Sequence, residues 1–164
     1  MTHRLLLGAT LALLSACEHG IDMHGTVVAP PEVQQLFSAS APGQLFVIAK
    51  LPPSSSELRD DGSVFCLPAA IERRIPVNGL ELGCATAGEV QVSAFAVPRT
   101  ADQIDCSGAG RVRAPSSAFS PDRFAPDAAL ASASGTATVK LDGGGSCSDG
   151  SFDFTLTLTP KASP

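Results

Sequence analysis

The sequence predicts an all-β fold, a single antiparallel β-sandwich of about seven strands. Three observations lead to this prediction. Short apolar or alternating segments of strand length recur along the chain, turns rich in the 15 Gly and 13 Pro separate them, and few segments have a helical pattern. The 164 residues are enough for one ordinary domain of this class.

Five strands are expected in the first part of the chain. The segment 21–28 alternates and ends in β-branched residues, and 44–50 is a continuous apolar run typical of a central, buried strand. The segment 63–68 is a short strand that ends at a proline. A proline inside 70–77 restricts that segment to a sheet edge or a strand end. Apolar residues occupy both faces of 89–97, so both sides of this strand are expected to be covered.

Two clear strands are expected near the C-terminus. The segments 135–141 and 151–158 both alternate, and the Gly-rich loop between them predicts a hairpin. The stretch 98–134 differs, because it is rich in Ala, Ser and Pro and contains no clear element. It is either a functional loop or partly disordered, and Pro126 limits any helix in it to a short one.

The N-terminal residues have the pattern of an export signal. They begin with MTHR, continue with the apolar run LLLGATLALL and end in small residues. A helix needs about 20 apolar residues to span the hydrocarbon core of a bilayer. This run is therefore too short for a stable span but suits a secretory signal.

The signal ends in the motif Leu14-Ser15-Ala16-Cys17. Cleavage after Ala16 at an ordinary site would put Leu14 where a small residue is required. The four residues instead resemble the lipobox of bacterial lipoproteins. This resemblance implies that Cys17 receives a diacylglycerol, becomes the first mature residue and is acylated, for example with palmitate, on its amine. Two acyl chains suffice for stable anchoring. A plain secretory signal with a spare cysteine at position 17 is the alternative.

Glu18 follows the anchor cysteine. In the enterobacterial sorting pattern, Asp at this position retains a lipoprotein in the inner membrane. Glu18 departs from that pattern, so the resemblance implies the outer membrane. The expected domain organisation is a signal peptide at 1–16, a lipidated N-terminus and short tether at 17–20, the β-sandwich at 21–159 and a tail at 160–164.

Four further cysteines are present, namely Cys66, Cys84, Cys106 and Cys147. An even number in an exported chain implies disulfides, and the absence of a CxxC pair argues against a competing Zn site. Three pairings are possible. We favour Cys66–Cys84, because both lie in or beside adjacent apolar segments, and Cys106–Cys147, because both lie in polar, Gly-rich loops.

Two stretches resemble a known class of β-sandwich. IDMHGTVVAP…APGQLFVIAK and VNGLELGCATAGEVQVSAFAV look like the opening strands and the later hairpin of transthyretin-like or carboxypeptidase-regulatory-like modules. The resemblance covers about half of the mature chain, and 98–134 departs from it. It implies an Ig-like or transthyretin-like sandwich and a non-catalytic role.

The mature sequence contains little that supports catalysis. Its two histidines, His19 and His24, both lie close to Cys17, and no GxSxG, SxxK or phosphate-binding loop is present. We therefore expect neither an enzyme nor a cofactor.

Metal sites are weaker candidates. Glu18, His19, Asp22 and His24 carry ligand types that suit Zn or Cu. The favoured interpretation is that His19 belongs to the tether and that Asp22 and His24 share the solvent-exposed side of a strand. Two acidic loops are candidates for calcium through Asp102, Asp105, Asp142 and Asp149, and Asp153 follows the second loop. We favour the interpretation that the Asp and Gly residues of these loops only form tight turns.

The charge balance limits the class of partner. The net charge is -5, and removal of the signal with Arg4 makes the chain more acidic. Nucleic acids and anionic lipid surfaces are therefore not expected as partners. We expect a membrane-anchored, non-catalytic module of the cell envelope with a possible envelope protein as partner. The alternative is a calcium-binding or small-ligand-binding protein that uses 98–134 and the Asp-rich turns.

Overall fold

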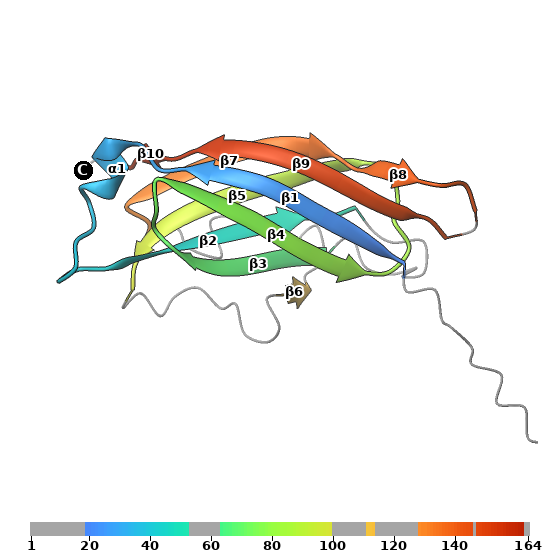
Figure 1. Cartoon of the computed structure of the whole chain (residues 1–164), viewed down its shortest axis with the longest axis horizontal. Helices are drawn as coiled ribbons and strands as arrows, with labels where there is room; N and C mark the ends of the chain where they lie inside the picture. Colours follow the sequence, from blue (N-terminus) through green and yellow to red (C-terminus); the bar gives the residue numbers. More distant parts are fainter. Residues whose placement is uncertain (1–18, 53–62, 100–110, 114–127, 146, 163–164) are drawn as a thin grey trace, which may run out of the picture.

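The computed structural model describes residues 19–52, 63–99, 111–113, 128–145 and 147–162. Within these residues the chain forms ten strands in two sheets, together with one short helix. Figure 1 shows the strands of the two sheets running along the length of the molecule. The predicted all-β class is confirmed.

The strands divide into a four-stranded sheet and a six-stranded sheet. The first has the order β4-β1-β9-β8, and the second has the order β10-β7-β5-β2-β3-β6. The bounds are β1 (Gly20–Val28), α1 (Pro31–Gln34), β2 (Gly43–Lys50), β3 (Ser63–Ala70), β4 (Arg74–Leu82), β5 (Glu89–Pro98), β6 (Arg111–Arg113), β7 (Ala131–Thr138), β8 (Lys140–Asp142), β9 (Asp149–Thr157) and β10 (Thr159–Pro160).

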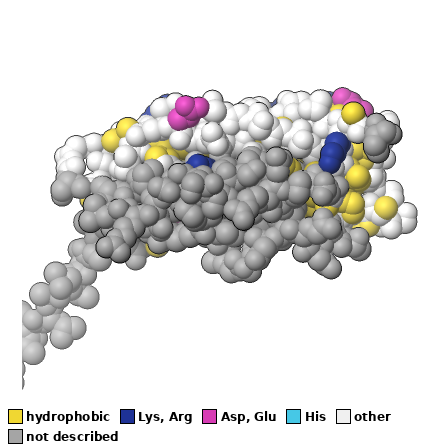
Figure 2. Space-filling view, turned by 180° about the vertical axis from the view of Figure 1, so that it is seen from behind, with side chains coloured by type: hydrophobic (Ala, Val, Ile, Leu, Met, Phe, Trp, Pro, Cys, Tyr) yellow, Lys and Arg dark blue, Asp and Glu magenta, His cyan; other side chains and the backbone are white. Residues whose placement is uncertain are grey.

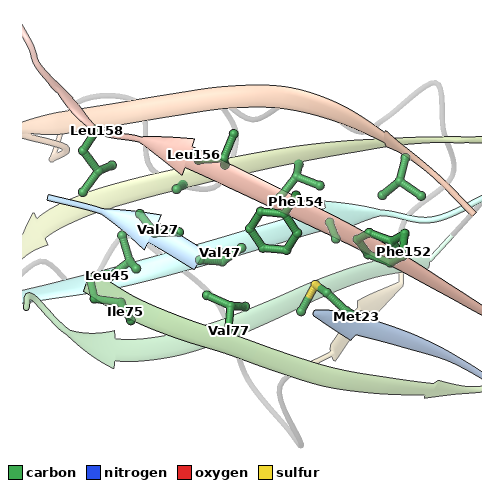
Figure 3. Packing of buried hydrophobic residues seen from close by; sticks show 14 of the residues in the cluster. Met23, Val27, Leu45, Val47, Ile75, Val77, Phe152, Phe154, Leu156 and Leu158 are labelled. Carbon is green, nitrogen blue, oxygen red and sulfur yellow. The ribbon is translucent and has the colours of Figure 1, made fainter. Parts of the chain in front are cut away.

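One hydrophobic cluster joins the two sheets. β1, β4 and β9 of the four-stranded sheet contribute to it, and so do β2, β5 and β7 of the six-stranded sheet. Figure 3 shows labelled members, including Val27 of β1, Val47 of β2 and Phe152 of β9. Each strand supplies alternate residues to this cluster, as expected for strands with one face on a core.

Three expectations for individual strands are confirmed. β2 lies between β5 and β3, and five of its residues are buried, so it is the central strand that its apolar run predicted. β4 contains Pro76 and is an edge strand. In β5, Val92 belongs to the shared cluster, while Phe95 and Val97 are buried outside it, so both faces are covered.

The prediction of purely antiparallel pairing is wrong for β1 and β9. These strands run parallel, from Ile21 opposite Gly150 to Val28 opposite Thr157. The sequence could not decide this point, because an alternating pattern specifies which face is buried and not the direction of the neighbouring strand.

The predicted C-terminal hairpin is also wrong in part. The segment expected as one strand is divided at Val139, which is buried and donates its backbone N–H to the carbonyl of Gly88. β7, before Val139, pairs with β5 in the six-stranded sheet. β8, after it, pairs with β9 in the other sheet. The chain crosses between the sheets here without interrupting its alternation, so the pattern conceals the crossing.

The stretch 98–134 contains more structure than expected. Arg111–Arg113 forms β6 beside β3, and the end of the stretch begins β7. Residues 100–110 and 114–127, which include the position of the expected short helix, lie outside the described residues. The described helix α1 lies elsewhere, at Pro31–Gln34, where Pro31 occupies a first-turn position that suits proline.

Candidate functional site

The start of β1 is the part of the described structure closest in sequence to Cys17. β1 begins at Gly20, one residue earlier than the sequence predicted. The carbonyl of His19 accepts a hydrogen bond of 2.8 Å from the backbone N–H of Gly83. On the other side, the backbone N–H of Gly20 donates to Oδ1 of Asp149 at 2.9 Å. Both flanking segments therefore fix the chain at the point where β1 begins.

Asp149 also lies beside the imidazole of His19. The Nδ1 atom of His19 is 3.3 Å from Oδ1 of Asp149, which is within ion-pair distance, yet this buried nitrogen has no hydrogen bond of acceptable geometry. The bond from the Gly20 N–H is shorter and well aligned. We therefore assign the positioning role of Asp149 to its contact with the backbone of Gly20.

A disulfide joins the two loops that flank the start of β1. Cys84, which follows β4, is bonded to Cys147, which precedes β9, with 4.8 Å between their Cα atoms. Close to it, the backbone N–H of Ala85 donates to the carbonyl of Ser148 at 2.8 Å. Because β4 and β9 are the two neighbours of β1, this bridge ties together the segments on either side of it.

The favoured disulfide pairing is therefore wrong. Cys84 was expected to bond Cys66, but Cys66 lies in β3 of the other sheet, whereas Cys84 and Cys147 follow and precede strands of the same sheet. The prediction relied on the nearness of Cys66 and Cys84 in the sequence. That nearness was misleading, because β3 and β4 belong to different sheets. Cys106 lies outside the described residues. With Cys84 and Cys147 joined, the remaining pair of the three possible connectivities is Cys66–Cys106.

Removal of the Asp149 carboxylate tests this arrangement. We expect Asp149→Ala to lower the free energy of unfolding by about 1 kcal/mol, because the backbone N–H of Gly20 loses a charged acceptor. Asp149→Asn keeps an acceptor oxygen and should recover much of the loss. Urea denaturation of both variants measures the difference. Equal stability of the alanine variant and the native protein would show that this contact does not hold the start of β1.

The calcium candidates are only partly brought together. Asp142 and Asp149 face each other as a register pair of β8 and β9, whereas Asp102 and Asp105 lie outside the described residues. One oxygen of Asp149 already contacts Gly20. Among the residues that the structure describes, no group of three or more His, Cys, Asp or Glu side chains is placed to hold a metal ion.

The other metal candidates lie on an exposed sheet face. Asp22 and His24 are both exposed on β1, in agreement with the solvent-exposure reading of the sequence. His24 Nδ1 lies 3.3 Å from Oδ1 of Asn78 on β4. Glu18 lies outside the described residues.

A hollow of about 630 Å³ lies along β5, β7 and β9. Neutral hydroxyl side chains dominate its lining, namely those of Ser93, Ser132, Ser134, Thr155, Thr157 and Thr159. Sequence reasoning missed this hollow. The alternating Ser and Thr residues of β7 and β9 were the signal, but such residues are equally common on an ordinary solvated sheet face.

Comparison of the chain with protein-family models, with curated proteins and with solved structures gave no match. None of the helices in the described part of the chain has the length and apolar character required to cross a bilayer. On the face shown in Figure 2, the described Lys and Arg side chains lie apart from one another.

Proposed function

We propose that this protein is a lipid-anchored protein of a bacterial cell envelope, held in the outer membrane by acyl chains on Cys17. Its all-β domain binds or supports another envelope component and catalyses no reaction. The lipobox resemblance of Leu14-Ser15-Ala16-Cys17 supports the anchor, and the sorting pattern at Glu18 supports the outer membrane. The resemblance to transthyretin-like and carboxypeptidase-regulatory-like modules supports a non-catalytic role.

The observation that carries this proposal is the fixed start of β1. His19 and Gly20 are already bonded to the folded domain, and only two peptide units separate His19 from Cys17. The Cα atoms of Cys17 and His19 are therefore at most about 7 Å apart. A domain on so short a tether stays against the bilayer, which favours a membrane-associated partner over a distant one.

The disulfide and the net charge of the chain agree with this proposal. A Cys84–Cys147 bridge suits an exported protein, because disulfides persist in oxidising compartments. The acidic net charge of -5 argues against a surface that binds nucleic acid.

Loss of the anchor tests the proposal. The variant should combine Cys17→Ala with an ordinary cleavable secretory signal in place of residues 1–16, so that an uncleaved signal does not hold it in a membrane. We expect the native protein to sediment with the outer membrane and to crosslink to a specific membrane partner, and the variant to lose both properties. Fractionation and in-cell crosslinking with mass spectrometry measure this.

A variant that stays in the outer membrane and keeps the same crosslinks would contradict the anchor. Circular dichroism of the variant is the control, because a folded domain released from the membrane separates loss of the anchor from loss of the fold.

The hydroxyl-lined hollow favours a second candidate function, the binding of a small neutral ligand. Ser93 lines this hollow although it is almost fully buried, and the hollow's lining includes no charged side chain among the described residues. A ligand-binding protein of this kind would bind its ligand equally well without the anchor. Equal ligand binding by the native protein and the anchorless variant, with no membrane partner for either, would favour this second function.

A further inference from the structure

Two polar residues are buried in the described part of the chain, Glu81 at 7% exposure and Ser93 at 2%. Glu81 interacts with a partner, whereas the hydroxyl of Ser93 makes no hydrogen bond with the side chains or backbone of the described residues. A buried hydroxyl without a hydrogen bond destabilises the folded state. The presence of a serine at position 93 therefore has to be explained by something other than stability.

Ser93 lies on the outward face of β5. Its neighbours in the strand, Val92 and Ala94, belong to the hydrophobic cluster between the sheets, so the Ser93 side chain points away from that cluster. Phe95, two residues later on the same face, is buried outside the cluster. An apolar side chain would suit the position of Ser93 as it suits that of Phe95, so burial alone does not account for a serine here.

A row of hydroxyls begins beside Ser93. In the six-stranded sheet Ser93 pairs with Ile48 of β2, which is fully buried, and with Ser134 of β7, which is exposed. The exposed positions of β7 alternate from Ser132 to Thr138, and each of them carries a hydroxyl. Since directly opposite residues have Cβ atoms about 5 Å apart, one ligand group can reach both Ser93 and Ser134.

Two hollows share Ser93 and Ser134 in their linings. The hollow of about 630 Å³ extends from these residues to Thr155 of β9, and a smaller one of about 280 Å³ extends to Gln91 and Thr136. The larger volume lies within the range of about 300 to 1,000 Å³ that is usual for small-molecule sites. A ligand in this hollow can therefore supply the hydrogen bond that the Ser93 hydroxyl lacks.

The lining of the hollows selects an uncharged ligand. The described residues around both of them include no Asp, Glu, His, Lys or Arg. A charged group placed there would lose water without gaining an ion pair. An anionic or cationic ligand is therefore disfavoured.

The lining also selects a ligand with several hydroxyls. Every polar side chain that the structure describes around the larger hollow is a Ser or Thr hydroxyl, which can both donate and accept a hydrogen bond. An apolar ligand would bury these groups without partners, at a cost in affinity. A ligand rich in hydroxyls offers a donor and an acceptor at each group, and neutral sugars have this chemistry.

We propose that the hydroxyl-lined hollow binds a neutral sugar and that Ser93 makes the central hydrogen bond to it. This inference rests on the second candidate function, the binding of a small neutral ligand, and names the class of that ligand. Ser93 is then retained at a cost to stability, because its hydroxyl gains a partner only when the sugar is bound.

Saturation-transfer NMR on the full-length lipidated protein, in micelles of a zwitterionic detergent, measures binding of defined probes. The neutral sugars are glucose, galactose, mannose, N-acetylglucosamine, maltotriose and chitotriose. Glucuronate is the charged probe, and N-acetylalaninamide is a neutral probe without hydroxyls. Tighter binding of a trisaccharide than of its monosaccharide would assign the ligand to a glycan chain, and equal binding would assign it to a free sugar.

We expect a millimolar dissociation constant for at least one neutral sugar, because the chain contains no Trp or Tyr for a sugar ring to pack against and hydrogen bonds carry the affinity. Glucuronate should bind about tenfold more weakly than glucose, since a carboxylate in this lining has no ionic partner.

Ser93→Ala is the decisive variant. We expect it to weaken sugar binding about tenfold and to raise Tm by roughly 3 °C, because the unbonded hydroxyl is removed. Loss of a merely structural hydrogen bond would lower Tm instead. Thr155→Ala, at an exposed position of the lining, should weaken binding without unfolding the protein. Thr138→Ala is the matched control, since Thr138 is exposed on β7 outside both linings, and it should bind sugar as the native protein does.

The failures are distinguishable. If no sugar binds but N-acetylalaninamide binds and Ser93→Ala weakens it, the second candidate function stands and the sugar is overturned. If no neutral probe binds, both fail. Sugar binding that Ser93→Ala and Thr155→Ala leave unchanged, or a lower Tm of Ser93→Ala, would overturn the role of Ser93. Equal binding of glucuronate and glucose would overturn the selection of a neutral ligand.

Discussion

Replacement of Cys84 and Cys147 together by serine is expected to lower the free energy of unfolding by about 4 kcal/mol. The bridge closes a loop with a sequence separation of 63 residues, and in the chain-entropy model a loop of this length restricts the unfolded chain strongly. It also ties together the two segments that flank β1, so its loss should loosen the start of that strand. Urea denaturation under oxidising conditions measures the change.

A reducing agent supplies the control for this prediction. It should destabilise the native protein at least as much as the double substitution does, because it breaks the same bridge. Peptide mapping of the unreduced protein should recover Cys84 linked to Cys147, and Cys66 linked to Cys106. Recovery of Cys66 linked to Cys84 would contradict the arrangement of the two loops.

The second large effect is expected at Gly25 in the middle of β1. A Cβ atom at this position would lie 2.3 Å from the ring of Phe154 on the neighbouring strand β9. Phe154 is buried and stacks near Phe152, with 6.3 Å between ring centroids, so its ring has little room to move. We expect Gly25→Ala to lower the free energy of unfolding by about 3 kcal/mol through overpacking.

A double-mutant cycle isolates this contact. Phe154→Leu should cost stability by itself, but the double variant should be more stable than the sum of the two single losses predicts, because the smaller side chain relieves the clash. Gly144→Ala is the matched control, since a Cβ there meets nothing within 4 Å. Additive losses in the cycle would show that Gly25 is required for another reason.

The sequence predicted the positions of the strands better than it predicted which strands pair with each other. Period-two alternation located β1 and β9, because one buried face determines that pattern, and runs of apolar residues located β2 and β5. The predicted bounds of all four strands lie within two residues of the observed ones. The same pattern continues through Val139, where the chain changes sheets, so it could not reveal the crossing. The partner of each strand depends on packing between segments distant in sequence, and one strand's pattern contains no record of it.

The candidate site was predictable only in outline. The motif at Cys17 indicated an anchor, and an even number of cysteines indicated disulfides. The role of Asp149 was not predicted, because in the sequence it has the pattern of an ordinary turn aspartate. Its carboxylate contacts the backbone N–H of Gly20 at 2.9 Å, although the two residues are 129 positions apart in the sequence.

We propose that Cys17 is the lipidated first residue of the mature protein, and the mass of the N-terminal peptide decides whether it is. The protein should be purified from bacterial membranes with detergent, digested and analysed by mass spectrometry. We expect a first peptide that begins at Cys17 and carries a diacylglyceryl group on its thiol and an acyl chain on its amine. A mature N-terminus at any other residue, or an unmodified thiol at Cys17, would contradict it.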